Sequence, residues 1–114
     1  MREVDFCGIN SGANVDKVER CGFTVFRGTA TSAPLIEECP VNLECRVVQI
    51  LELESHNLVL GEVMDTHASE ECLTADGSID FVKVNPIVFL DKPTRKYCGV
   101  GTIEGEAFGV GLEL

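Results

Sequence analysis

A long run of alternating apolar residues near the middle of the chain most constrains the fold. From Val41 to Leu53 apolar and polar residues alternate, and the phase of the alternation shifts near Val48. Alternation with a period of two predicts a half-buried β-strand, and the shift predicts a bulge or bend. The turn-forming residues Glu54–Asn57 follow, and Leu58–Met64 again suits a strand. The sequence therefore predicts a long antiparallel β-hairpin.

The residues after this hairpin predict short strands and few helices. Glu70–Asp80 is acidic and contains an Asp-Gly turn signal, so we expect an exposed excursion there. Phe81–Pro86 predicts one helical turn that ends at the proline, and Ile87–Leu90 predicts a short buried strand. Tyr97–Gly101 predicts a further strand segment and Glu104–Phe108 a turn of helix. We expect one domain over residues 1–114, an all-β barrel with short helical additions.

A loop near the N-terminus is rich in Gly, Ser and Asn. It runs from Cys7 to Asn14 and leads into a predicted short helix, which Asn14 or Asp16 would cap. Backbone N–H groups at such a junction, together with Ser11 and Lys17, could bind an anion. An ordinary capped surface helix explains the same pattern, because such junctions are common. Both interpretations stay open from the local sequence.

The charge balance excludes several classes of partner. The chain has nine Lys and Arg against 19 Asp and Glu, for a net charge of -10. Such a surface repels polyanions, so we expect no nucleic-acid binding and no docking on anionic membranes. No stretch approaches the roughly 18–20 apolar residues of a membrane-spanning helix. The first residues, Met1–Cys7, lack the features of a secretory signal, which predicts a cytoplasmic protein.

Six cysteines are many for 114 residues. A disulfide framework would require an oxidising compartment, which the absence of a secretory signal disfavours. Zinc ligation is also disfavoured, because no C-x-x-C motif occurs and Cys39 and Cys45 are separated by five residues. We therefore expect no metal site, and we expect most of the thiols to be small buried hydrophobic side chains.

Other catalytic patterns do not fit the chain. Gly99-x-Gly101 lacks the third glycine and the following helix of a dinucleotide-binding turn, and no nucleophile-elbow G-x-S-x-G is present. His56 and His67 lack metal-ligand spacing. His56 lies at the predicted hairpin turn, where a side chain can reach the mouth of a pocket, but the local sequence favours a plain surface histidine at that position.

Three segments together resemble one family. Phe6–Gly12 (FCGINSG), followed by Val15–Lys17 (VDK), resembles the Y-C-G-x-x-S-G-x-x-V-D-K-F segment of the flavin reductase-like, FMN-binding split-barrel family, and of its flavoredoxin group in particular. Ala33–Cys45 (APLIEECPVNLEC) is similar to that group's A-P-x-I-E-E-C-P-x-N-L-E-C. Glu54–Val63 (ESHNLVLGEV) is similar to its G-S-H-x-x-x-x-G-E-V. The segments occur in the family's order and spacing, and the resemblance as a whole extends over nearly the whole chain.

The resemblance implies a Greek-key split β-barrel that forms homodimers and binds FMN noncovalently near the dimer interface. It implies an electron-transfer or flavin oxidoreductase function with NAD(P)H as co-substrate. The matching positions imply that Ser11, Gly12 and Lys17 bind the flavin or its phosphate. They also imply that His56 is catalytic and lies near the nicotinamide or the isoalloxazine face.

The chain also departs from the family pattern. Ala13 and Asn14 stand where a basic residue is often found, and Val18 replaces an aromatic residue. Family members carry further strands before the Cys-Gly-x-x-Ser-Gly segment, so we expect a barrel that is incomplete at its N-terminus, with exposed strand edges. The alternative to a flavin-binding domain is a non-catalytic truncated split-barrel remnant that dimerises without binding flavin.

Overall fold

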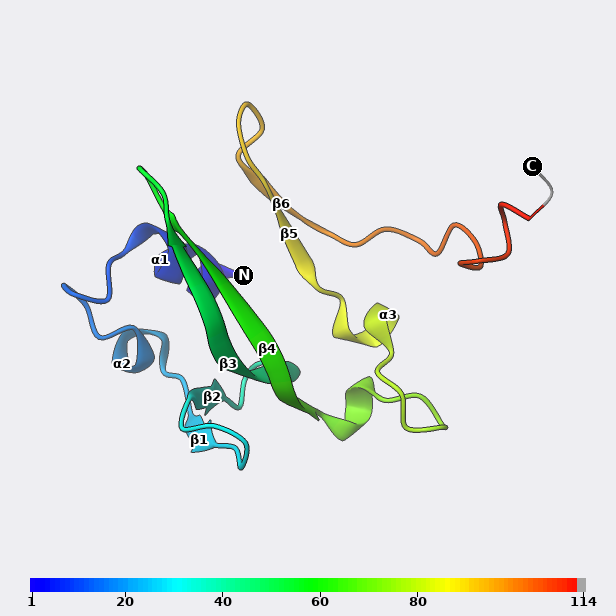
Figure 1. Ribbon diagram of the computed structural model, residues 1–114, viewed down its shortest axis with the longest axis horizontal. Coiled ribbons are helices and arrows are strands. Elements are labelled where there is room, and N and C mark those ends of the chain that lie inside the picture. Colours follow the sequence, from blue (N-terminus) through cyan, green and yellow to red (C-terminus); the bar gives the residue numbers. More distant parts are fainter. Residues whose placement is uncertain (113–114) are drawn as a thin grey trace.

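The computed structural model describes residues 1–112, and the chain begins with two helices rather than with a loop (Figure 1). Helix α1 spans Arg2–Ile9 and α2 spans Lys17–Cys21. The expectation of a loop from Cys7 was wrong for its first residues, because α1 continues to Ile9 and carries acidic residues in its first turn, where the helix dipole favours them. The predicted second helix is confirmed with Asp16 as its N-cap, since the Asp16 carboxylate accepts a hydrogen bond from Glu19 N at 3.0 Å.

A small sheet precedes the long hairpin. Strand β1 (Val25–Arg27) pairs antiparallel with β2 (Pro34–Ile36), and Leu35 of β2 is buried, with 4% of its surface exposed. Strand β2 also contacts the following strand, β3 (Val41–Glu52). Phe26 lies opposite Leu35 in the pair. This small sheet and the loop between its strands cover one side of the long hairpin at the end where β3 begins.

The predicted hairpin is confirmed and is longer than expected. Strand β3 spans Val41–Glu52 and β4 spans Asn57–Ala68, paired antiparallel along their whole length. The register shifts between Glu44 and Cys45 and again between Val47 and Gln49, so the predicted bulge is present and a second irregularity accompanies it. The two shifts separate the hairpin into a lower part beside β1–β2 and an upper part that ends in the turn.

The prediction that the apolar residues of this hairpin are the buried ones was wrong. Leu43 and Val47 are 53% and 56% exposed, whereas the intervening Glu44 is fully buried. The alternation of the sequence marks a real strand, but the polar face is the one that the β1–β2 segment covers. Within residues 1–112 the apolar face of the lower part is exposed. Both faces of the upper part are exposed as well, and they include Val48, Ile50 and Val59.

The chain after β4 forms small local units. A 3-10 helix, η1 (Glu70–Cys72), is followed by α3 (Phe81–Val84), β5 (Ile87–Leu90) and β6 (Lys96–Gly99), and β5 pairs antiparallel with β6. The predicted helical turn and both predicted strands are therefore confirmed. The Glu70–Asp80 segment is not wholly exposed, because Cys72 is buried, with 5% of its surface exposed.

Two expectations for the C-terminal region were wrong. Strand β5 is not buried, since each of its four residues is 40% exposed or more. Glu104–Phe108 forms no helical turn of its own, and hydrogen-bonded turns begin only at Glu106, whose carbonyl accepts from Gly109 N at 3.2 Å. In both places the described chain supplies no covering layer, so apolar sequence alone does not produce burial.

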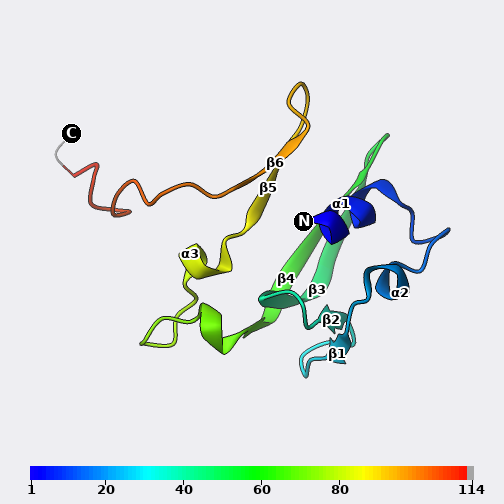
Figure 2. The same cartoon turned by 180° about the vertical axis from the view of Figure 1, so that it is seen from behind.

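The described residues form an open arrangement of three separate two-stranded sheets. Figure 2 shows from behind that the β5–β6 hairpin and the C-terminal segment lead away from β3–β4. The radius of gyration is 17.2 Å, against about 13 Å for a compact domain of this length. The fold is β-rich with few short helices, as predicted, and its sheets are not closed into a barrel within residues 1–112. In this same part of the chain, no helix has the length and apolar character needed to span a bilayer.

Candidate functional site

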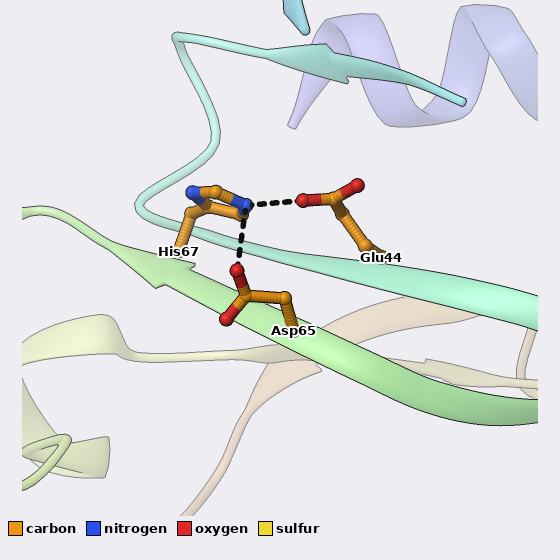
Figure 3. Close-up of side chains that lie close together, drawn as sticks. All are labelled: Glu44, Asp65 and His67. Carbon is orange, nitrogen blue, oxygen red and sulfur yellow. Dashed lines mark hydrogen bonds and ion pairs between the residues drawn. The ribbon is translucent and has the colours of Figure 1, made fainter. Parts of the chain in front are cut away.

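The most tightly built polar cluster lies on the covered face of the lower hairpin. Strand register places Asn42 opposite His67 and Glu44 opposite Asp65, so these side chains share one face of β3–β4. His67 Nε2 lies 2.7 Å from Glu44 Oε1 and 3.8 Å from Asp65 Oδ2 (Figure 3). Glu44 is fully buried, whereas the His67 side chain is 30% exposed. The cluster therefore joins a buried carboxylate to an imidazole that reaches the surface.

Hydrogen bonds from the β1–β2 loop surround the Glu44 carboxylate. Oε1 accepts from Thr29 N at 3.1 Å, and Oε2 accepts from Thr31 N at 2.7 Å and from Thr31 Oγ1 at 3.1 Å. The hydrogen bond with His67 and those with Thr31 lower the pKa of the Glu44 carboxyl to about 2, against the effect of burial, which raises it. Glu44 is thus ionised at neutral pH and anchors the loop between β1 and β2 to the hairpin.

The same cluster offers three ligand atoms of the kinds that bind metal ions. One atom each from Glu44, Asp65 and His67 lies within 4.8 Å of the other two. Each Glu44 oxygen already accepts two hydrogen bonds, however, and a metal ion would have to displace some of them. The geometry is that of a hydrogen-bonded anchor, and the sequence-based expectation of no metal site stays a prediction.

A hollow of about 260 Å³ opens beside His67. Phe26, Cys39 and Asn42 line it together with His67, and the Phe26 ring meets the imidazole edge-on, with ring centroids 5.8 Å apart. Among residues 1–112, Nδ1 of His67 has no hydrogen-bond partner, so the imidazole retains one ring nitrogen that could contact a bound molecule. Sequence reasoning missed this cluster, although polar residues recur at i, i+2 on both arms of the hairpin and could have identified it.

The predicted cofactor-binding residues lie close together, Ser11 and Gly12 on the loop between α1 and α2 and Lys17 at the first residue of α2. Ser11 Oγ accepts a hydrogen bond from Ala13 N at 3.2 Å, and Lys17 Nζ donates to the Cys7 carbonyl at 2.7 Å. Gly12 and Lys17 line the same shallow surface hollow, and a Cβ at Gly12 would meet no atom within 4 Å. The Lys17 ammonium has two further N–H donors and the Ser11 hydroxyl has its own proton, so the loop fits an anionic group such as a phosphate.

His56 lies apart from this loop in the hydrogen-bond network. It closes the turn between β3 and β4, where Leu53 N donates to the His56 carbonyl at 3.0 Å, and its Nδ1 lies 3.0 Å from Ser55 Oγ. The residue is exposed, as expected for a turn. Within residues 1–112 no hydrogen bond or ion pair joins His56 to Ser11, Gly12 or Lys17. The structure therefore groups three of the four predicted site residues and leaves His56 at the end of a separate element.

Comparison with known proteins decides the family. A family model described as a flavin reductase like domain matches residues 2–98. The chain belongs to the flavin reductase-like family. Two flavoredoxin structures resemble this flavin reductase-like chain over almost its whole length. The flavoredoxin of Desulfovibrio vulgaris (Miyazaki F) has a TM-score of 0.86 at 36% identity, and that of Methanosarcina acetivorans has 0.83 at 38%.

These comparisons also bear on the fold and on the extent of the chain. The flavoredoxin matches cover 97% and 96% of this chain but 58% and 56% of the other chains. A curated relative from Archaeoglobus fulgidus, described only as an uncharacterized protein, is 35% identical over 80 residues, which are 70% of this chain and 44% of the relative. This flavin reductase-like chain thus spans about half the length of the proteins it matches, and the predicted split-barrel fold class is confirmed.

Proposed function

We propose that this chain is the FMN-binding part of an electron-transfer domain of the flavoredoxin kind. The observation that carries the proposal is the match to two flavoredoxins over at least 96% of the chain at 36% identity or more. The family match over residues 2–98 supports the same conclusion. Because the chain spans only part of those proteins, the domain assignment to residues 1–114 and the activity of the whole protein belong to this proposal.

The loop between α1 and α2 is the proposed site for the phosphate end of FMN. Lys17 supplies the positive charge and two unused N–H donors, Ser11 supplies a hydroxyl, and Gly12 leaves open space for close approach. FMN, when bound, supplies the electron-transfer chemistry, and the protein supplies binding and orientation. With a net charge of -10, the chain would otherwise repel a phosphate, so the contribution of Lys17 is expected to be large.

His56 is proposed to contact the nicotinamide of NAD(P)H or the isoalloxazine face. It sits at the end of two paired strands, which hold the turn in place, and it is exposed and reachable by a bound nucleotide. The contact of Nδ1 with Ser55 Oγ fixes one side of the ring and leaves Nε2 for a ligand. His56 is thus suited to orient a nucleotide that approaches from outside the protein.

A homodimer is part of the proposal, supported by the exposed area. The described chain has 9509 Å² of accessible surface, against about 6,100 Å² for a compact monomer of 12.4 kDa. The excess far exceeds the roughly 800 Å² that each partner buries in an interface of standard size.

A cytoplasmic location is also part of the proposal, and it rests on the sequence argument alone.

The same exposed surface supports the second candidate function. Apolar residues on the upper part of β3–β4, such as Val48 at 67% and Ile50 at 54% exposed, suit protein contact rather than a cofactor. On this alternative the chain is a non-catalytic split-barrel remnant that dimerises without flavin. The two candidates differ in one property, which is flavin binding by the chain as it stands.

The binding of FMN and of riboflavin to Lys17→Ala tests the proposed site. Only FMN carries the phosphate, so the variant should lose FMN affinity by about tenfold or more while riboflavin affinity stays nearly unchanged. Lys96→Ala, an exposed lysine on β6, is the matched control and should bind both flavins like the parent chain. Equal losses for both flavins in Lys17→Ala would remove Lys17 from the site.

A further inference from the structure

Two cysteine thiols face each other where α1 meets α2. Cys7 Sγ in α1 and Cys21 Sγ in α2 lie 3.9 Å apart. Both residues are half-buried, so a small reagent can reach them. Cys39, Cys45 and Cys98 are exposed and Cys72 is buried, and none of them makes a thiol–thiol contact within residues 1–112. The Cys7–Cys21 pair therefore stands apart from the other thiols of the described chain.

We propose that Cys7 and Cys21 form a reversible disulfide that clamps the segment carrying Ser11, Gly12 and Lys17, which comprises the α1–α2 loop and the start of α2. This inference rests on the proposed function for its effect on flavin, but the bond itself does not. A disulfide needs its sulfurs about 2 Å apart, so the pair has only about 2 Å to close. The thiols sit near the ends of two short helices, which can shift by this amount without unpairing any strand. The structure thus holds the pair close to bonding distance.

The position of the pair gives the bond a consequence for the site. Cys7 and Cys21 are separated by 14 positions, and the segment between them contains all three predicted cofactor residues of the loop. In the reduced protein the loop is tied to α1 by the hydrogen bond from Lys17 Nζ to the Cys7 carbonyl. A covalent bond at the same place would remove most of the remaining freedom of the loop. Oxidation should therefore pre-order the loop and strengthen the binding of an anionic ligand there.

The chemistry requires a disulfide as oxidant, and low-molecular-weight disulfides such as oxidised glutathione are the proposed class. One cysteine thiolate attacks a sulfur of the oxidant, forms a mixed disulfide and displaces one thiol. The other cysteine then attacks the protein-bound sulfur, forms the Cys7–Cys21 bond and displaces the second thiol. The two cysteines lose two electrons and two protons, which reduce one disulfide to two thiols.

The environment of Cys21 suits the second of these steps. Burial raises the pKa of the Cys21 thiol, and its hydrogen bond with Cys7 adds to the effect. A thiol that is slow to ionise reacts poorly with a dilute oxidant but well with a sulfur already held beside it, because the second attack is intramolecular. The 3.9 Å approach of the two sulfurs holds each thiol beside the other, so whichever cysteine forms the mixed disulfide has its resolving partner in place.

Disulfide mapping on the full 114-residue chain tests the bond. After exposure to oxidised glutathione and blocking of the free thiols, peptide mass mapping should find a Cys7–Cys21 link with the loss of two hydrogens, reversible by dithiothreitol. Cys21→Ser should instead accumulate a glutathione adduct on Cys7, and the control Cys39→Ser should still form the link. Single glutathione adducts on the parent chain, with no Cys7–Cys21 link, would overturn the proposal.

Two further measurements test the clamp, and only one of them needs flavin. Lys17 and Arg20 lie inside the closed segment, so trypsin should cut there about tenfold more slowly in the oxidised chain. The FMN dissociation constant should fall by about fivefold on oxidation. Equal cleavage rates in the two states would refute the clamp. Slower cleavage of an oxidised chain that binds no FMN in either state would refute the proposed function and leave the clamp standing.

Discussion

Replacement of Gly28 by alanine is expected to displace the Glu44 carboxylate from its hydrogen-bonded position under the β1–β2 loop. A Cβ at position 28 would lie 1.8 Å from Glu44 Oε1 and 2.2 Å from Cδ. Side-chain ends can often move aside, but this carboxylate is fully buried and accepts hydrogen bonds from Thr29 and Thr31. It cannot give way without losing those contacts and the one with His67.

The expected cost of Gly28→Ala is that of overpacking a tight site, about 1–3 kcal/mol. For a chain of this size that corresponds to a fall in Tm of about 5–15 °C. Thermal unfolding followed by circular dichroism measures it, with Gly101→Ala as control, because a Cβ at Gly101 would meet no atom within 4 Å. In a Glu44→Ala background the clash partner is gone, so Gly28→Ala should then cost almost nothing. An equal cost in both backgrounds would refute the reasoning.

Three other outcomes are expected. The folded-state pKa of Glu44 is about 2 against an ordinary 4.5, so its contribution to stability is present above pH 4.5 and is lost as the pH falls toward 2. The difference in free energy of unfolding between the parent chain and Glu44→Gln, measured by urea unfolding, should therefore become smaller as the pH falls through that range. A difference that stays constant would contradict this. Leu35→Ala should destabilise by about 2–5 kcal/mol, and a loss below about 1 kcal/mol would show that β2 carries little of the core. His56→Ala should slow flavin reduction by NAD(P)H in single-turnover experiments with little loss of FMN affinity, and an unaltered rate would remove His56 from the reaction.

The local elements of the fold could be predicted because their signals are local. Alternation identified β3, the turn residues located its end, and Asp16 marked the start of α2 to within a residue or two. The burial of Glu44 could not be predicted in this way. It depends on Thr29 and Thr31, which lie 13 to 15 positions earlier and reach the carboxylate because β2 packs on β3. An acidic residue within an apolar strand gives no local signal of such partners.

In the candidate site, too, the positions that follow from the local sequence could be predicted, and the contacts between distant residues could not. Ser11, Gly12 and Lys17 are close in sequence, so their proximity follows from the chain itself. The His67–Glu44 contact joins residues 23 positions apart, and Cys7 approaches Cys21 only because the chain turns back between α1 and α2. The expectation of buried thiols was wrong for Cys39, Cys45 and Cys98, because a residue preference for burial is realised only where a covering layer is present.

Flavin binding by the 114-residue chain tests the central claim most directly. A titration with FMN, followed by the change in flavin fluorescence, should saturate at one flavin per chain, with tighter binding than riboflavin because of the phosphate site around Lys17. A fluorescence per flavin that stays equal to that of free FMN up to millimolar concentration would contradict the account and favour the alternative in which this chain binds no flavin.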